Sequence, residues 1–288
     1  MALNSVNTNI DASIALQSLE LTNSQLAAVQ KQISTGYRVA DAVDDGAAYA
    51  IAQRVRSDVG ALTSANQQLG NVQGLLSTTV TSLNDVSNTL SSARDVLVQL
   101  ASSNTQGSQR TQYVAQYQSL VANIKTFFQD GTYNGKTLIG NLTGSEGTFG
   151  GIDVIRNEAG ATYSIGTFSG SVFYGSIAFT STQLSSATSV QGFIAVGTTS
   201  TTGAFINQLN SLGTELNTYG AATNYVTNQV NYNNDKITAL NDGLGALVDA
   251  NLAQESAQLQ SLQIKQQLGT QALSIANQSP QSLLSLFK

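Results

Sequence analysis

The sequence predicts a mainly α-helical protein in which long coiled-coil helices flank a short central β-hairpin region, with no large outer domain. Three observations support this fold class. The chain of 288 residues contains one proline, so long helices can run without interruption. Fourteen of the 25 glycines lie between Gly131 and Gly203, which separates a glycine-rich centre from two glycine-poor arms. Apolar residues in both arms recur with the alternating steps of three and four that are typical of coiled coils.

The two terminal arms carry one apolar stripe each. In the N-terminal arm the stripe consists of Leu19, Thr22, Leu26, Val29 and Ile33, and Leu3, Val6, Ile10 and Ile14 lead into it. In the C-terminal arm it runs through Leu252, Glu255, Leu259, Leu262, Gln266, Gly269, Leu273, Ala276, Pro280, Leu283 and Phe287. A compact helical bundle shows the same spacing over shorter helices, so the pattern favours a coiled coil without excluding a bundle. Two thin helices bury little apolar surface by themselves, so we expect the arms to order fully only against further copies of the chain.

Further stripes and turn residues predict the inner helices. The stripes cover residues 72–100, 113–127 and 205–247. Gly36 is expected to end the first helix, and Asp44 or Asp45 to cap the second. Turn residues at 102–107 separate two of the inner helices, and the Asn-Asp-Gly segment at 241–245 is expected to interrupt or weaken the last one.

The centre of the chain contains short alternating runs bounded by turns. The Asn-Gly pair at 134–135 suits a type I′ hairpin turn. Residues 151–156 and 161–165 are predicted to be two strands joined by a tight turn, and 171–174 and 176–179 to be further strands. Because this region is small, we expect hairpins lying on the helices and not a separate domain.

Residue types that catalysis or metal binding usually requires are missing. The chain contains no Cys and no His, which excludes disulfides, thiolate zinc sites, Cys nucleophiles and Ser-His-Asp triads. Asp41, Asp44 and Asp45 lack the ligand spacing of a calcium loop, so we interpret them as capping and turn residues. The net charge of −5 disfavours nucleic-acid binding. We therefore expect no catalytic residues, no cofactor, no metal and no enzymatic activity.

The residues at the start of the chain and the lengths of its apolar runs bear on location. No apolar run is long enough to span a bilayer, so membrane insertion is not expected. The first residues lack the basic start and apolar core of a cleaved signal peptide. Taken alone, these features predict a cytoplasmic protein.

Motifs near both ends of the chain resemble those of bacterial flagellin. At the N-terminal side they are Gln30–Val39 and Asp44–Ala52, and at the C-terminal side Gln266–Leu273 and Ala276–Gln281. The turn within Tyr133–Leu138 has a counterpart in the family as well. One departure occurs in the second motif, where Gly-Ala-Ala-Tyr replaces the usual Ala-Ala-Gly order. The matching parts occur in the correct order along the chain.

The resemblance covers roughly residues 1–140 and 203–288 and implies a domain organisation. Flagellins form a coiled-coil inner tube, called D0, and a helical outer shell, called D1. This chain would then divide into an N-terminal D0 helix (1–40), N-terminal D1 helices with the start of a hairpin (41–140), a central β-hairpin or variable segment (141–202), a C-terminal D1 helix (203–250) and a C-terminal D0 helix (251–288).

The same resemblance implies a structural function. Flagellins are exported unfolded through the flagellar type III channel and polymerise under a cap into the filament used for swimming. It also revises the expected location to a secreted, extracellular flagellum. The expected partners are further copies of the chain, the export machinery and its chaperone, the filament cap and hook-junction proteins. The expected inter-subunit seam consists of Leu19, Leu26, Val29, Ile33, Leu259, Leu262, Leu273 and Leu283.

A segment around Arg94 resembles the part of some flagellins that an innate immune Toll-like receptor senses. Those flagellins carry a further Arg where this chain has Ser92, and a Leu where it has Val96. A Glu expected on the following helix is replaced by Gln116. The resemblance therefore implies a poor agonist of that receptor.

Two alternative functions remain open from the sequence. A hook–filament junction protein shares the terminal pattern, and a soluble adhesin or glycan-binding module could also stand on a helical stalk. The Ser/Thr-rich stretches at 180–182 and 198–202 suit either O-glycan attachment or a simply solvated loop.

Overall fold

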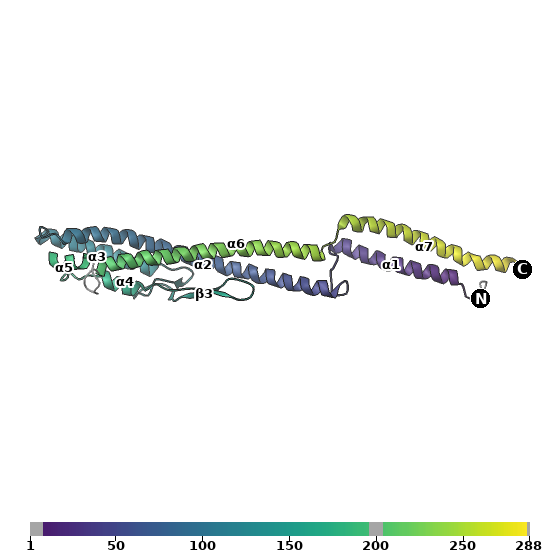
Figure 1. Ribbon diagram of the computed structural model, residues 1–288, viewed down its shortest axis with the longest axis horizontal. Helices are drawn as coiled ribbons and strands as arrows, with labels where there is room; N and C mark the ends of the chain where they lie inside the picture. The colour runs from purple at the N-terminus through teal and green to yellow at the C-terminus, as the bar shows by residue number, and fades with distance from the viewer. Residues whose placement is uncertain (1–7, 196–203, 287–288) are drawn as a thin grey trace. The chain divides into compact units, whose positions relative to one another are not determined.

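The computed structural model describes residues 8–195 and 204–286, with the side chains of the last helix described as far as Gln278. Its helices are α1 (Ile10–Thr35), α2 (Gly46–Leu100), α3 (Gly107–Asp130), α4 (Gly170–Ile177), α5 (Ala187–Ile194), α6 (Ala204–Val248) and α7 (Leu252–Leu286). Its strands are β1 (Lys136–Thr137), β2 (Thr148–Phe149), β3 (Ile152–Ile155) and β4 (Thr162–Ile165). The described part of the chain is mainly helical and has no large outer domain, as predicted (Figure 1).

The helix ends follow the capping residues that the sequence contains. Gly36 ends α1 in the left-handed region, with φ 74°, and its N–H donates to the carbonyl of Gln32. The carboxylate of Asp45 accepts the N–H groups of Ala47 and Ala48, each at 3.0 Å, and so caps the start of α2. These expectations are confirmed.

One expected interruption is absent. Helix α6 continues through residues 241–245 to Val248. A glycine inside a helix costs only about 1 kcal/mol relative to Ala. Val248 lies buried with Ala48 and Ala52 of α2, with Leu244 and Leu247 partly buried beside them, and this packing outweighs the local cost.

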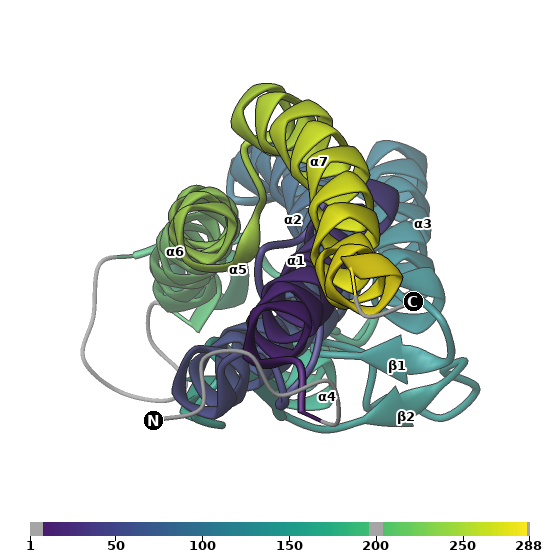
Figure 2. The same ribbon diagram turned by 90° about the vertical axis from the view of Figure 1, so that its right-hand side faces the viewer.

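The chain divides into two compact units. One contains residues 1–59 and 238–288, and the other contains residues 60–237. In the first unit, α1 and α7 lie side by side, which Figures 1 and 2 both show. The same unit contains a small buried cluster that consists of Val39, Ala48, Ala52 and Val248.

The second unit has one continuous apolar core. The predicted stripe of α2 forms its centre, and the stripes of α3 and α6 pack against it. Fully buried members of these stripes include Leu76, Leu83, Val86, Leu90, Ala93, Leu97, Leu100, Tyr117, Ile124, Phe205 and Val226. The expected inner helices and their core faces are therefore confirmed.

The central segment forms two small sheets. Strands β3 and β4 pair antiparallel, with Val154 opposite Tyr163, as the sequence predicts. Asn134 and Gly135 both have positive φ, 48° and 73°, which is the backbone of a type I′ turn. Strand β1 leaves that turn and pairs in parallel with β2, an arrangement that the sequence does not indicate.

The further strands expected at 171–174 and 176–179 do not form. Residues 170–177 are helix α4, whose cap is the hydroxyl of Ser169, which accepts the N–H of Val172. The buried positions are Gly170, Phe173 and Ile177, and their spacing is helical. The prediction was wrong because a short apolar run fits either structure, and packing against the core decides between them.

The central segment is anchored to α6 by polar contacts. The side chains of Gln229 and Asn233 both donate to the carbonyl of Arg156, at 3.2 and 3.0 Å. Next to them, Lys236 forms an ion pair with Glu158 in the turn between β3 and β4. The hairpin therefore lies on the helical layer of its own unit, as expected.

Helix α4 can approach the core closely because its first residue is a glycine. A methyl group at Gly170 would lie 2.4 Å from the carbonyl oxygen of Ile139 and 2.8 Å from a ring carbon of Phe128. We predict that Gly170→Ala lowers the free energy of unfolding by about 1–3 kcal/mol, because a backbone atom cannot move aside cheaply.

The matched control is Gly175→Ala in the same helix, where no heavy atom lies within 4 Å of the added methyl group. It should leave stability unchanged or raise it by up to about 1 kcal/mol through helix propensity. Urea unfolding followed by circular dichroism compares the two variants. Equal midpoints would contradict the close packing of α4.

Candidate assembly surface

Helices α1 and α7 each turn one face toward the other. Apart from Lys31 and Gln32, which bond to the connection after α1, the less exposed positions of α1 and its cap are Asn9, Ala12, Ala15, Leu19, Thr22, Leu26, Val29 and Ile33. On α7 they are Glu255, Leu259, Leu262, Gln266, Gly269, Leu273 and Ala276. Val29 and Leu262 are the most enclosed, with 4% and 3% of their surface exposed. The predicted seam residues on the described helices therefore lie on the faces that α1 and α7 turn toward each other. Leu283 lies beyond the described side chains.

Three contacts fix the register of this antiparallel pair. The amide of Asn9 donates to the carbonyl of Ala276 at 2.8 Å, and the amide of Gln266 donates to Asn23 at 2.8 Å. Between them, Gly269 faces Leu19, and a methyl group on the glycine would lie 3.1 Å from the leucine side chain. A small residue at this point allows the two helices to lie close together.

Ile10 and Ile14 do not continue the stripe, contrary to expectation. They are 61% and 60% exposed. Asn9 caps α1 and also bonds to α7, so the face containing Asn9 and Ala12 points toward α7. Successive helix positions are about 100° apart, and Ile10 therefore points away from the pair.

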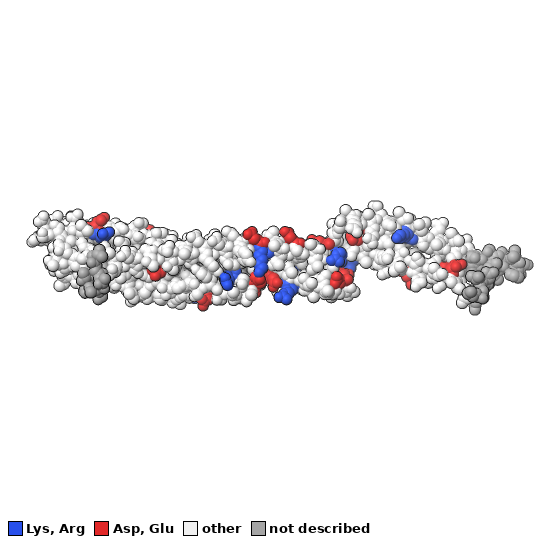
Figure 3. Space-filling view, in the orientation of Figure 1, with Lys and Arg blue, Asp and Glu red and all other residues white. Residues whose placement is uncertain are grey.

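Large apolar side chains remain exposed on the outer faces of both helices. They are Ile10, Ile14, Leu16 and Leu21 on α1, and Leu252, Ile264, Leu268 and Ile275 on α7. Their exposed fractions range from 47% for Leu16 to 64% for Leu268. Few charges accompany them, and Figure 3 shows a mostly uncharged face along these helices. We take these exposed apolar side chains as the candidate assembly surface.

A shallow groove lies between the two helices beside these residues. Its volume is about 280 Å³. It is lined by Asp11, Ile14, Ala15 and Ser18 of α1, and by Gly269, Ala272 and Ala276 of α7. The groove exists because α7 presents only small residues here, and an aliphatic side chain could enter it.

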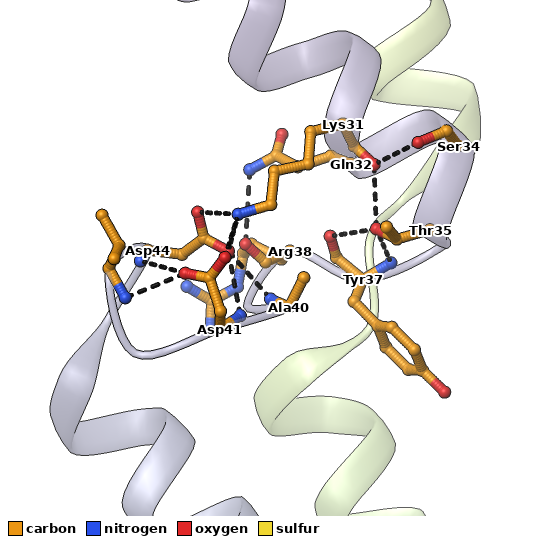
Figure 4. A network of polar contacts seen from close by, with 10 residues as sticks. Lys31, Gln32, Ser34, Thr35, Tyr37, Arg38, Ala40, Asp41 and Asp44 are labelled. Atoms are coloured by element: carbon orange, nitrogen blue, oxygen red, sulfur yellow. Dashed lines mark hydrogen bonds and ion pairs between the residues drawn. The ribbon is translucent and has the colours of Figure 1, made fainter.

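The connection between α1 and α2 is organised by one lysine (Figure 4). The ammonium of Lys31 lies 2.7 Å from a carboxylate oxygen of Asp41 and 2.8 Å from both oxygens of Asp44. Asp44 also accepts the N–H of Ala40, and Asp41 accepts the N–H of Val43. The ammonium lowers the pKa of both carboxyls, and they in turn raise the pKa of Lys31. The groups are open to solvent, so each pair contributes little stability.

The connection between α6 and α7 is tied to the same region by backbone bonds. The N–H groups of Arg38 and Val39 donate to the carbonyl of Val248, at 2.7 and 3.2 Å. The Arg38 guanidinium donates to the carbonyl of Leu247 at 2.6 Å, and the N–H of Ala250 donates to Gly36. Both connections are therefore ordered within a single chain.

Four residues, Ser92, Arg94, Val96 and Gln116, were compared above with the segment of some flagellins that a Toll-like receptor senses. One of the four is not on the surface. Ser92, Arg94 and Gln116 are exposed, but Val96 is buried in the core with 6% of its surface exposed. Its side chain serves packing between helices and cannot contact a partner directly.

Neither a metal centre nor a membrane span is found in the described ranges. Within residues 8–195 and 204–286, no three His, Cys, Asp or Glu side chains gather where they could bind a metal ion. Over the same ranges, none of the helices combines the length and apolar character that crossing a bilayer requires.

Comparison with known proteins gives one consistent result. A family model for the bacterial flagellin N-terminal helical region matches residues 6–143, and a model for the C-terminal helical region matches residues 199–287. The chain is 31% identical to flagellin FljM of Caulobacter vibrioides, over 100% of both chains. The chain belongs to the bacterial flagellin family. Flagellin FljK of the same organism is 32% identical over 100% of both chains, and a flagellin of Brucella melitensis is 31% identical over 99% of each.

This flagellin is a structural subunit of the flagellar filament, as the sequence predicted. Its fold resembles that of a protein from Vibrio parahaemolyticus described as flagellar hook-associated. The TM-score is 0.56 at 15% identity, and the match covers 72% of this chain and 100% of the other. At that identity the likeness concerns the fold alone.

Leu262 and Ile264 offer a direct test of the two faces of α7. Leu262 is buried toward α1, whereas Ile264 is 58% exposed. We predict that Leu262→Asp exposes the α1 and α7 amides of the free subunit to hydrogen exchange, because an unpaired carboxylate costs several kcal/mol when buried. Ile264→Asp, the matched control, should leave that protection unchanged. Equal loss in both variants would contradict the assignment of faces.

The Lys31 cluster predicts a defined pH dependence. The lowered carboxyl pKa values contribute stability that is present above their ordinary value of 3.8 and lost as the pH falls below it. The raised pKa of Lys31 contributes stability that is present below 10.5 and lost above it. The stability difference between the natural chain and Lys31→Gln should therefore be largest from about pH 4 to pH 10.

Carboxyl titration by NMR measures the cause directly. In Lys31→Gln the pKa values of Asp41 and Asp44 should rise toward 3.8. Lys265→Gln removes an exposed lysine from α7 and should leave both values unchanged. If Lys31→Gln also leaves them unchanged, the cluster does not exist in solution.

Proposed function

We propose that this flagellin assembles through the outward apolar faces of α1 and α7, which pack against the same two helices of neighbouring subunits. The observation that supports this proposal is the set of eight exposed large apolar side chains, four on each helix. Only three charged residues lie on α1 and two on α7, so little charge opposes close packing between copies. Each square ångström of apolar surface removed from water contributes about 25 cal/mol, and a filament repeats this contribution at every subunit.

The domain organisation is proposed from the family resemblance, and its bounds differ from those of the two compact units, which divide the chain after residues 59 and 237. Residues 1–40 and 251–288, which include α1 and α7, form the D0 inner tube. Residues 41–140 and 203–250, which include α2, α3 and α6, form the D1 shell, and residues 141–202 form the central variable segment. The buried core shared by α2, α3 and α6 supports one helical shell for the second group.

The predicted seam residues have a supporting role in this scheme. Leu19, Leu26, Val29, Ile33, Leu259, Leu262 and Leu273 join α1 to α7 and thereby orient the outer faces. Leu283 of the predicted seam lies outside the described side chains. The contacts between subunits are then made by the exposed residues, with Ile264 and Leu268 as the best candidates on α7.

The central segment is proposed to be the outer surface of a thin, smooth filament. Exposed residues at the tips, around Gly144 to Gly150 and Glu158 to Gly160, suit contact with solvent, antibodies or attached glycans. Support comes from the anchoring of β3 and β4 to α6, which leaves no separate globular unit in the described chain.

Partners and location are proposed from family membership. The chain is expected outside the cell, in contact with copies of itself and, at earlier stages, with the export machinery, its chaperone, the cap and the hook-junction proteins. The chain is also expected to be a poor innate-receptor agonist. The burial of Val96 and the polar Ser92 and Gln116 support this expectation.

A hook–filament junction protein is the second candidate function. The fold likeness to a hook-associated protein is compatible with it. Identity of 31% or more to flagellins, over 100% of both chains, favours the filament subunit. An adhesin or glycan-binding module has no specific observation in its favour.

The test changes exposed apolar residues and leaves the subunit fold intact. We predict that the double variant Ile264→Ser/Leu268→Ser folds normally by circular dichroism but fails to form filaments that sediment after seeding. Val172→Ser is the matched control, since Val172 is 66% exposed on α4 of the central segment. It should assemble normally. Normal sedimentation of the double variant would rule out the outer face of α7 as an assembly surface.

A further inference from the structure

A cavity in the second unit has chemistry that assembly does not explain. It lies between strand β4, the residues that follow it, and helix α6, and its volume is about 260 Å³. Its inner wall is formed by the buried side chains of Ile165, Tyr219 and Ala222. Ser164 and Thr218, which are both exposed, are among the residues that line it, so small molecules can reach it from solvent.

The single charged group that lines the cavity is the carboxylate of Glu215. It is half-buried on α6, and no hydrogen bond or ion pair joins it to any residue in the described ranges. Burial raises the pKa of Glu215, because no positive charge compensates for lost hydration. Burial, and to a smaller extent the charge of the same carboxylate, raises the pKa of Tyr219, whose hydroxyl donates to the carbonyl of Gly166 at 3.2 Å.

One other carboxylate of this unit has a cation beside it. Glu158 pairs with Lys236 on the same helix, and its pKa is lowered. At Glu215 the fold supplies no cation, and the cavity beside it is large enough for a ligand group.

The cavity lining favours a cation over an anion or a neutral sugar. No lysine or arginine lines it, so an anion would meet only the Glu215 carboxylate. Tyr163 supplies an aromatic wall, and its ring is fixed by stacking on Tyr225 with centroids 4.0 Å apart. Aromatic rings and carboxylates together attract ammonium and guanidinium groups.

We propose that this cavity is a binding site for an organic cation, an alkylammonium or alkylguanidinium group whose charge pairs with Glu215. The alkyl portion would lie against Ile165 and Ala222. The hydroxyl of Thr218 would accept a remaining N–H donor. The site is independent of the terminal helices, since all of its residues belong to the second unit.

Two sources could supply this group. One is a lysine or arginine side chain of a neighbouring subunit, and the other is a free amine. Both present the same chemistry to the cavity, so binding is tested first on the unassembled chain.

The probes are n-butylammonium and n-butylguanidinium chloride, with n-butanol as the neutral probe. Binding to the full-length monomer is followed by NMR shifts of the Gly166 and Thr167 amides. We expect either cation to bind at least tenfold more tightly than n-butanol, and Glu215→Gln to reduce cation affinity about tenfold, as for loss of one charge-assisted hydrogen bond. Asp235→Asn removes the same charge from an exposed position on α6 and should leave the affinity unchanged.

Equal binding of the cations and n-butanol, or equal binding by Glu215→Gln and the natural chain, would overturn the proposal. Thr218→Val provides a second variant, with a smaller expected loss, in case Glu215→Gln fails to fold.

A seeded assembly assay then assigns the source. If a neighbouring side chain is the source, n-butylammonium chloride should slow assembly of the natural chain. The same salt should not slow assembly of Glu215→Gln, and an equal concentration of sodium chloride should not slow assembly of the natural chain. Unchanged assembly, with binding retained in the monomer, supports a free amine. The monomer result does not depend on whether filaments form, so failure of this site and failure of the proposed assembly surface are distinguishable.

Discussion

A narrow apolar stripe is the constraint on which this flagellin depends. Because the stripe repeats every 3.5 residues, each helix buries one face and leaves the other in solvent. In the second unit three stripes meet, and α2, α3 and α6 close a core that contains fully buried Leu83 and Leu90. In the first unit only two stripes meet. The outer faces of α1 and α7 then retain isoleucines and leucines that a single chain cannot cover.

Polar residues inside the stripes determine how the helices align. Asn233 is fully buried on α6, where it donates to Asn66 of α2 and to the carbonyl of Arg156 beside β3. In the terminal pair, Gln266 and Asn23 bond to each other across the seam. Apolar contacts alone tolerate sliding by one repeat, but an unpaired buried amide costs about 1–3 kcal/mol. The buried amide of Asn233 therefore favours one register for the central hairpin. The exposed bond between Gln266 and Asn23 matches the register of the terminal helices without that cost.

The connections between helices use short-range bonds in place of apolar packing. Around the first connection, Lys31, Asp41 and Asp44 bond to one another and to backbone N–H groups. Around the second, the backbone of Gly36 to Val39 pairs with that of Val248 to Ala250. Such bonds order exposed chain segments that have no core of their own. They also fix where α1 ends and where α7 begins within a single subunit, before any neighbouring subunit is present.

The sequence by itself determined the long helices, their buried faces in the second unit, the cap at Gly36, a cap at Asp44 or Asp45, the Asn134-Gly135 turn and the β3–β4 hairpin. Each of these depends on a pattern repeated over many residues or on a backbone conformation that few residue types adopt. Only the tertiary structure decided that residues 170–177 are helical, that α6 continues through 241–245, and that Ile10 and Ile14 face outward. It alone also placed Glu215 in a cavity without a cation. In these cases local preferences differ by about 1 kcal/mol or less per residue, so contacts with distant parts of the chain determine the outcome.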